Sequence, residues 1–299
     1  MAKVAIFGTE GMLGRELVQV IGQEHEVVEF NRSGNQSKRS SRIVKFDAND
    51  FNNKDLIYEL KDVNYIFNSI AIVKQKIPLN PNPQTLSATI QVNALFPLSL
   101  EKVVSDSAKI IEIGTDCVFS GNRGGYLESD LKDPTDVYGW SKALGESSSA
   151  RIMRLRTSII GRHPVQKSSL LDWFLGREMN SKVTGYSNHF WNGMTTLQFS
   201  KIVLGVINQG VFEPGTFHLS AEDTISKGEL LKLASTKFNR LDLRIDLEPH
   251  SIAIDRSLKT LYPDVSMRLW KSAGYERVPT INEMLEEFVQ ASEIERMIS

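Results

Sequence analysis

Residues 3–21 read KVAIFGTEGMLGRELVQVI, an apolar run followed by a glycine-rich turn and apolar residues at helical spacing. A G-x-x-G-x-x-G pattern indicates a dinucleotide-binding turn when it follows a strand and opens a helix, as it does here. The first glycine permits a tight turn, the second lets a pyrophosphate approach the backbone, and the third lets helix and strand pack closely. The helix N-terminus then attracts the phosphates. The pattern predicts dinucleotide contacts from the turn and the first helical residues, Gly8, Gly11, Met12, Leu13 and Gly14.

Strand-like and helix-like segments go on alternating beyond this turn. Expected strands are 26–30, 42–46, 64–72, 109–113 and 152–156, and expected helices include 51–60, 85–105 and the run around 136–146. Such alternation predicts an α/β protein with a Rossmann-type, doubly wound parallel sheet and helices on both faces. Past residue 161 the regular alternation of strand-like and helix-like segments ends. We expect a dinucleotide-binding domain over 1–161 and a smaller, mixed α/β substrate lobe over 162–299, some of whose segments return to the first domain.

The composition is that of a soluble globular protein, with 299 residues, 41% hydrophobic and 24% charged. A net charge of -1 gives no sign of a nucleic-acid surface, and no apolar run approaches the ~18 residues of a membrane span. The single cysteine, Cys117, fits a reducing compartment, and the N-terminus lacks a hydrophobic signal region. The five histidines show no metal-binding spacing. We therefore expect a cytoplasmic protein without nucleic-acid, membrane or metal partners.

The end of the second expected strand bears on which dinucleotide is bound. An acidic residue there would accept a hydrogen bond from the adenosine ribose. The strand instead runs into Asn31 and Arg32, and an arginine can pair with a 2′-phosphate. Further basic residues follow at Lys38, Arg39 and Arg42. These residues favour NADP(H), while Glu29, one or two positions earlier, keeps NAD(H) as an alternative.

Three further residues lie at the ends of expected strands, at the edge of the sheet where ligands bind in this architecture. Asp47 is placed to contact the adenine amino group. Ser69 and Ala71 are small enough for a cofactor to lie against the backbone. In the loop that follows, Lys74 is a candidate for substrate contact.

The segment 136–146 reads DVYGWSKALGE and carries the predicted chemistry. Tyr138 and Lys142 stand four apart, so they share one helix face. A phenol titrates near ~10, and a neighbouring ammonium lowers that pKa. Thr115, at the tip of the fifth strand, would bind a keto oxygen together with Tyr138. As hydride reaches the carbonyl carbon, Tyr138 delivers the proton, and Lys142 also binds the nicotinamide ribose.

The glycine run, IGTDCVFSG at 113–121 and VYGWSKALGE at 137–146 together resemble the extended short-chain dehydrogenases/reductases. Within that group the chain is similar to the dTDP-4-dehydrorhamnose reductase family and related nucleotide-sugar reductases. The resemblance implies Thr115, Tyr138 and Lys142 as the catalytic set and Asn93 as an active-site neighbour. It implies NADPH-dependent reduction of a keto group on a nucleotide-activated deoxysugar, for a surface polysaccharide or glycoconjugate. Members of this family often form homodimers.

Two departures from the family pattern fall beside Thr115. Cys117 stands where these reductases have tyrosine, and Gly114 replaces a serine. The sugar pocket is therefore expected to differ, and Cys117 is either a small packing residue or a reactive thiol. Candidate substrate contacts in the second half lie in an aromatic segment, whose side chains either bind the nucleotide sugar or pack between the lobes. The full candidate set for substrate is Lys74, Asp116, Cys117, His189, Trp191, Asn192 and Thr195.

Two other functions compete with the reductase. A nucleotide-sugar epimerase or 4,6-dehydratase with tightly bound NAD shares the fold. In the dehydratases the pattern after the fifth strand resembles Thr-Asp-Glu, and in this chain Cys117 stands at the third position. Epimerisation does not require that acid/base pair, so it stays an alternative. The regulatory subunit of methionine adenosyltransferase is also similar to these reductases, yet it serves as a non-catalytic binding partner.

Overall fold

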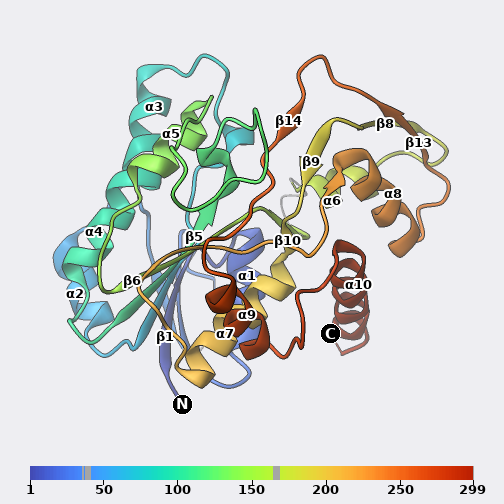
Figure 1. The fold of residues 1–299 in the computed structure, drawn as a ribbon. Helices are drawn as coiled ribbons and strands as arrows, with labels where there is room; N and C mark the ends of the chain where they lie inside the picture. Colours follow the sequence, from blue (N-terminus) through green and yellow to red (C-terminus); the bar gives the residue numbers. More distant parts are fainter. Residues whose placement is uncertain (36, 38–41, 164–168, 299) are drawn as a thin grey trace.

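A seven-stranded parallel sheet forms the centre of the computed structural model, which describes residues 1–35, 37, 42–163 and 169–298 (Figure 1). Its strand order is β11-β6-β5-β4-β1-β2-β3. The strands are β1 Lys3–Phe7, β2 Glu26–Asn31, β3 Arg42–Lys45, β4 Tyr65–Asn68, β5 Lys109–Thr115, β6 Ile152–Thr157 and β11 Gly215–His218. The order reverses at β1, between β2 and β4, which is the switch point where ligands bind in doubly wound sheets. The predicted Rossmann-type architecture is confirmed.

Helices cover both faces of this sheet (Figure 1). One layer holds α1 Met12–Ile21, α7 Thr196–Gln209 and α9 Pro263–Ser272. The other holds α2 Asn53–Leu60, α3 Pro83–Ile90, α4 Phe96–Val103 and α5 Val137–Leu144. The sheet residues alternate between two apolar clusters, one under each layer. In the second cluster, Phe7 stacks on Phe30 with ring centroids 4.1 Å apart, next to Phe46 and Phe96.

The predicted long helix over 85–105 is interrupted by a π-helical turn, Gln91–Leu95, between α3 and α4. Pro97 explains the wider turn, because it lacks the N–H that an α-helix would direct at the carbonyl of Asn93. Gly145 packs against that carbonyl, and a Cβ at this glycine would lie 2.4 Å from it. The π turn thereby brings Asn93 against the end of α5.

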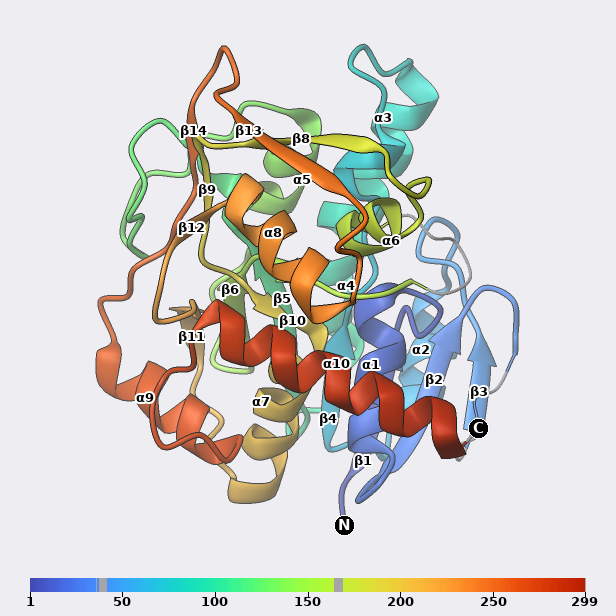
Figure 2. The same cartoon turned by 90° about the vertical axis from the view of Figure 1, so that its right-hand side faces the viewer.

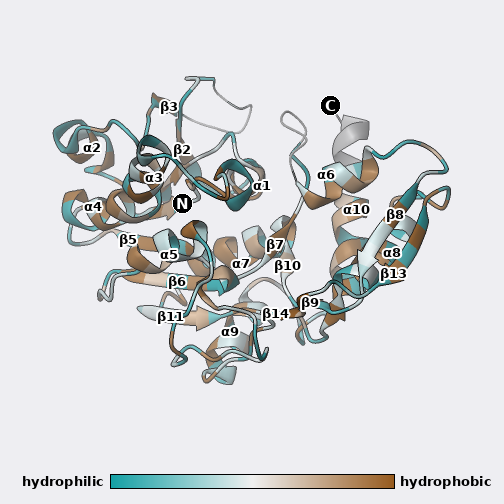
Figure 3. Cartoon of the chain, turned by 90° about the horizontal axis from the view of Figure 1, so that it is seen from above, coloured by the Kyte–Doolittle hydropathy of each residue, from teal (hydrophilic) through white to brown (hydrophobic). Residues whose placement is uncertain are grey.

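A second lobe is built from short strands and helices (Figure 2). Its small sheets are β10-β7, β12-β9-β14 and β13-β8. Their strands are β7 Ile159–Ile160, β8 Lys182–Tyr186, β9 His189–Trp191, β10 Met194–Thr195, β12 Ile225–Ser226, β13 Arg244–Glu248 and β14 Ile254–Asp255. The helices are α6 Leu170–Leu175, α8 Lys227–Lys237 and α10 Ile281–Ile298. Seen from above, this lobe and the helices α2–α4 lie on opposite sides of the molecule (Figure 3).

Parts of the second half join the central sheet and its helices. β11 pairs with β6 in parallel, and α7 packs against α1. A capping box opens α8, because Ser226 and Glu229 exchange hydrogen bonds between side chain and backbone. The division of the chain at residue 161 stays a prediction.

A buried polar network joins this returning strand to the loop after β5. Arg156 donates to both carboxylate oxygens of Glu146 at 2.7 Å and to Nε2 of His218 at 2.8 Å. Nδ1 of His218 lies 3.0 Å from the carbonyl of Tyr126 and 2.8 Å from that of Lys259. Carbonyls only accept hydrogen bonds and a guanidinium only donates them, so Nδ1 carries the proton and Nε2 accepts. His218 is therefore neutral in the folded protein.

We expect the free energy of unfolding to fall as the pH drops below ~6.5, the pKa of a histidine in an unfolded chain. Burial, together with the Arg156 guanidinium, lowers the pKa of His218, although Glu128 opposes this shift. The unfolded state then binds more protons over the window below ~6.5, so acid favours unfolding. Urea denaturation at several pH values between 5 and 8 would measure this slope. A His218→Asn variant with the same slope as wild type would contradict the assignment.

Candidate active site

The glycine turn between β1 and α1 has the shape predicted for a pyrophosphate site. Gly8 adopts a φ of 85°, and the amide of Gly11 donates to its carbonyl at 2.9 Å. A Cβ at Gly14 would lie 2.2 Å from the same carbonyl oxygen, so only glycine lets α1 start this close to β1. The first turn of α1 carries no acidic residue that would repel an anion. The turn therefore fits the phosphates of a dinucleotide.

Replacing Gly14 by alanine should disrupt this turn. The added methyl group would collide with backbone atoms, which cannot move aside as the end of a side chain can. We expect a loss of about 1–3 kcal/mol in stability from overpacking. Dinucleotide affinity should fall at least ~10-fold, since the amides at the helix start are displaced. Isothermal titration with NADPH would show whether the loss is specific, with Gly205→Ala as the control, because a Cβ there collides with the backbone of Ser272 where α7 meets α9.

Several predicted cofactor residues support the loops around this turn through their side chains. Ser69 donates to the carbonyl of Phe7 at 2.6 Å. Asn31 donates to the hydroxyl of Thr9 at 3.1 Å and accepts from the amide of Gly34 at 2.9 Å. These contacts shape the loops on either side of Gly8. Direct contact of Asn31 and Ser69 with a dinucleotide stays a prediction.

Asn93 uses its side chain on protein partners as well. Its oxygen accepts from the amide of Ile72 at 2.8 Å, and its nitrogen donates to the carbonyl of Ile72 and to the hydroxyl of Ser141, both at 2.9 Å. It thus ties the segment after β4 to α5. Its place beside the predicted catalytic helix agrees with the expectation from the resemblance, and its contact with a cofactor is untested.

The remaining predicted cofactor residues lie nearer the surface. Arg32 is exposed beyond the end of β2, and Asp47 is exposed after β3, with its carboxylate accepting from the amide of Asn49 at 2.9 Å. Ala71 is half-buried after β4. Arg42 pairs with Glu59 at 2.7 Å. Of the other basic residues behind the second strand, Lys38 and Arg39 lie outside the described residues.

The structure brings Thr115 and Tyr138 together at the carboxyl end of β5. Asp136 caps α5 by accepting from the amide of Gly139 at 2.8 Å. A Cβ at Gly139 would lie 2.2 Å from the carbonyl of Cys117, so α5 starts in direct contact with the chain that leaves β5. The hydroxyl of Thr115 lies close enough to the phenol of Tyr138 to lower its pKa. This pair can bind one oxygen atom of a ligand between two hydroxyl groups.

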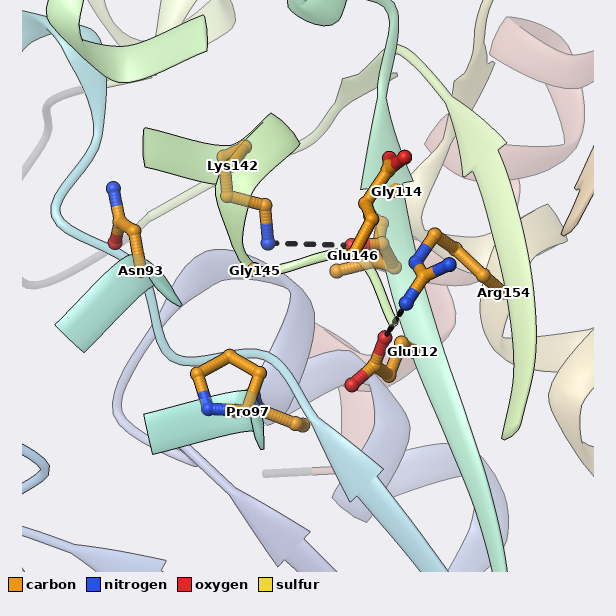
Figure 4. A pocket seen from close by; sticks show the side chains of 10 residues that line it. Asn93, Pro97, Glu112, Gly114, Lys142, Gly145, Glu146 and Arg154 are labelled. Carbon is orange, nitrogen blue, oxygen red and sulfur yellow. Dashed lines mark hydrogen bonds and ion pairs between the residues drawn. The ribbon is translucent and has the colours of Figure 1, made fainter. Parts of the chain in front are cut away.

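The predicted lowering of the pKa of Tyr138 is wrong for this arrangement. Burial raises the pKa of Tyr138, and the nearby Cys117 and Asp116 add to that shift, while Thr115 opposes it. The Nζ atom of Lys142 instead reaches the carbonyl of Ile113, at 3.5 Å, in a polar pocket behind β5 (Figure 4). The phenol is therefore protonated at neutral pH, which suits a proton donor.

Cys117 lies two residues after Thr115, and the amide of Cys117 donates to the Thr115 hydroxyl at 3.2 Å. Burial raises the pKa of the Cys117 thiol to about 12, and Asp116 adds to this shift. A thiol with that pKa is protonated at neutral pH and is a poor nucleophile. Of the two roles considered for Cys117, the structure favours the small packing residue.

Charged residues from both lobes surround Asp116. Burial raises the pKa of Asp116, and Arg256 and Lys227 oppose the shift. Arg256 donates to the carbonyl of Phe119 at 2.8 Å, and Lys227 opens α8. Lys74 reaches across to Asp136, the cap of α5, at 2.8 Å. Sequence reasoning found Lys74 and Asp116 but missed Lys227 and Arg256, which no local pattern places near β5.

The predicted aromatic segment packs within the second lobe. His189 and Trp191 are buried on one side of β9, and Nε2 of His189 lies 3.0 Å from the carbonyl of Ile252. Asn192 exchanges two hydrogen bonds with the backbone of Leu258, at 2.8 and 3.0 Å. Thr195 is buried and donates to Gln198. These partners favour the packing alternative, and contact of the segment with substrate stays a prediction.

Neither a metal-binding cluster nor a membrane-spanning helix is found among the described residues. Within residues 1–35, 37, 42–163 and 169–298, no three His, Cys, Asp or Glu side chains gather in a way that could hold a metal ion. None of the helices described there is both long and apolar enough to cross a membrane.

The chain is similar to known proteins in sequence and in fold. The chain is 27% identical over 221 residues to a dTDP-4-dehydrorhamnose reductase of Aggregatibacter actinomycetemcomitans, covering 72% of this chain and 63% of that relative, which is less than two thirds of its length. A dTDP-4-dehydrorhamnose reductase structure from Clostridium acetobutylicum superposes with a TM-score of 0.72 at 19% identity, over 97% of this chain and 99% of that one. The reductase from Bacillus anthracis, in complex with NADP, gives 0.73 at 18% identity, over 97% and 98%. The RmlD substrate binding domain model matches residues 2–293, and the chain belongs to that family.

Proposed function

We propose that this protein is an NADPH-dependent reductase of a keto group on a nucleotide-activated deoxysugar. The observation that carries the proposal is the nearness of the Thr115 and Tyr138 hydroxyls, at the same edge of the sheet as the glycine turn. Family membership and the dTDP-4-dehydrorhamnose reductase relative support the choice of substrate class. The proposed context is the synthesis of a surface polysaccharide or glycoconjugate.

The residues present fit a dinucleotide, because Gly14 lets α1 begin directly against the turn, where the first amides of the helix can bind phosphates. The bound NADPH would supply a hydride. Thr115 and Tyr138 would hold the keto oxygen, and Tyr138 would give its proton to that oxygen as negative charge develops. Lys142 would bind the nicotinamide ribose and stabilise the charge, after moving from the carbonyl of Ile113.

Positive charges near Asp116 suit the diphosphate of a nucleotide sugar. Lys74, Lys227 and Arg256 surround the start of α5 and the chain leaving β5. We assign diphosphate binding to Lys227 and Arg256 and a sugar contact to Asp116 and Cys117. The substitution of cysteine for the family's tyrosine then leaves more room beside the sugar.

A direct assay tests this function. Purified protein is mixed with NADPH and a panel of UDP-, dTDP- and GDP-linked 4-keto sugars, and the loss of NADPH absorbance is followed. Turnover of at least one sugar supports the reductase. Tightly bound NAD without net NADPH consumption would support the epimerase. Cofactor binding without turnover of any sugar would support the non-catalytic binding partner.

Arg32 should set the preference for NADPH. We expect Arg32→Ala to raise the KM for NADPH about tenfold or more and to leave the KM for NADH nearly unchanged, since a charge-assisted bond to the 2′-phosphate is lost. Arg42→Ala is a matched control, because Arg42 pairs with Glu59. Equal effects of both variants on NADPH would contradict the assignment.

We also propose a homodimer and a cytoplasmic location. Trp140 and Leu144 on α5 are 52% and 60% exposed, and Leu95 on the adjacent π turn is 48% exposed. Large apolar side chains gathered on one surface often mark a protein interface. A monomeric mass in sedimentation experiments at micromolar concentration would contradict the dimer. The lone cysteine fits the reducing cytoplasm.

A further inference from the structure

A small polar pocket lies behind Lys142, between α5, β5 and β6 (Figure 4). Its volume is about 10 Å³, roughly the space of one water molecule. Three charged side chains line it: Glu112 from β5, Arg154 from β6 and Glu146 from the end of α5. The uncharged side chain of Asn93, from the π turn, lines it as well. The Lys142 amine reaches into this space, where the carbonyl of Ile113 at 3.5 Å is a distant partner.

Glu112 and Arg154 form a buried ion pair across β5 and β6. They are register partners in the sheet, only 6% and 4% exposed, and Nη2 of Arg154 donates to Glu112 at 2.8 Å. Arg154 also donates to the carbonyl of Ser147 and the hydroxyl of Thr216, both at 3.1 Å. A buried pair of this kind is expensive to desolvate and adds little net stability. Its position beside Lys142 suggests another role.

The two carboxylates in the pocket differ in how far they are neutralised. Glu146 is paired with two cations, Arg156 at 2.7 Å and Lys132 at 2.8 Å. Glu112 has an ion pair with Arg154. Among the charged groups that act on Lys142, Glu112 is therefore the stronger attraction and Arg154 the opposing one.

We propose that Glu112 and Arg154 are positioning residues for Lys142. The carboxylate draws the ammonium into a retracted position behind β5, and the guanidinium limits this attraction, so that the amine can also move to the dinucleotide side of α5. The inference rests on the proposed function in assigning Lys142 a role with the cofactor, but the charge coupling itself is independent of any substrate.

Removing the charge of Glu112 and removing the charge of Arg154 should shift the pKa of Lys142 in opposite directions. Burial lowers the pKa of Lys142, Glu112 and Glu146 oppose this, and Arg154 adds to it. Removing the negative charge in Glu112→Gln should move the lysine titration to lower pH, and removing the positive charge in Arg154→Gln should move it to higher pH. The double variant should titrate between the two single variants, since the two changes partly cancel. A pair that only held β5 and β6 together would not shift Lys142 in opposite directions.

The titration can be followed by NMR on the full chain labelled with [ε-¹³C]lysine, with Lys142→Arg identifying the signal. Arg162→Gln is the control, because Arg162 pairs with a different buried carboxylate, Asp172, at 2.6 Å. The double variant keeps two neutral, hydrogen-bonding side chains in the pocket and serves if a single variant fails to fold.

Opposite shifts in the two single variants, with the double variant between them, support the inference. Shifts in the same direction, a double variant outside that interval, or an equal shift in Arg162→Gln overturn it. Because the titration needs no substrate, it stands even if no sugar in the panel is reduced. With an active enzyme, the pH profile of kcat in Glu112→Gln should shift in the same direction as the lysine titration, while the KM for the sugar stays within about twofold.

Discussion

Replacing Tyr138 by phenylalanine is expected to reduce kcat about 10²- to 10⁴-fold, the range contributed by a positioned proton donor. The hydroxyl is the group that lies beside Thr115, and its removal leaves the developing alkoxide without a proton source. The ring and the start of α5 are retained, so NADPH should bind within about twofold of the wild-type affinity. Because burial raises the pKa of Tyr138, the wild-type rate of reduction should not fall through neutral pH from ionisation of this phenol.

Stopped-flow measurement of NADPH consumption, with a separate fluorescence titration of NADPH binding, distinguishes chemistry from cofactor affinity. Tyr58→Phe is the matched control, since Tyr58 is 64% exposed on α2, away from β5. If Tyr138→Phe turned over every accepted sugar at the wild-type rate, Tyr138 would not be the proton donor. The non-catalytic and epimerase alternatives would then have to be weighed again.

Local signals explain why the first half of the fold was predictable. The glycine turn needs three glycines at fixed spacing, and the packing of Gly14 against Gly8 shows the physical reason for that spacing. Buried parallel strands such as β1 and β5 are continuous apolar runs that stand out in a sequence. The π turn was missed, although Pro97 was a visible signal that the helix over 85–105 could not be regular.

The second half depends on contacts between residues far apart in the chain. Its short strands, such as β12 and β14 with two residues each, are too brief for periodicity to reveal. Arg256 and Lys227 lie about 110–140 residues beyond Asp116, and their effect on its carboxylate comes only from the packing of the lobes. In β9, alternation turns Trp191 inward and leaves Phe190 exposed at 40%, which a list of aromatic residues could not foresee.

The direction of the Tyr138 pKa shift was beyond sequence reasoning for a similar reason. Helical spacing places Tyr138 and Lys142 on one face, but it does not say where a flexible lysine directs its amine. Burial and the Glu112 side of the pocket decide that in three dimensions. The spacing therefore predicted that the two residues share a helix face, and the structure was needed to show which charge acts on which group.

Replacing Arg156 by methionine is expected to lower the free energy of unfolding by about 3–5 kcal/mol. Arg156 is 2% exposed and holds both oxygens of Glu146 and the unprotonated nitrogen of His218. Although burial opposes it, the Arg156 guanidinium holds the pKa of Glu146 below its usual range. Without that partner, the buried carboxylate keeps its ion pair with Lys132 and the attraction of Arg154, and His218 loses its donor.

Denaturation in urea would measure the loss, with Arg277→Met as the matched control. Arg277 also bonds two carboxylates, Glu222 at 2.9 Å and Glu283, but all three side chains are well exposed. Exposed pairs contribute ~0–1 kcal/mol because water screens them, so the same substitution should cost little there. If the two variants lost equal stability, burial would not be what makes the Arg156 network matter. The larger loss should also shrink at acid pH, because protonation of Glu146 and His218 already weakens the wild-type network.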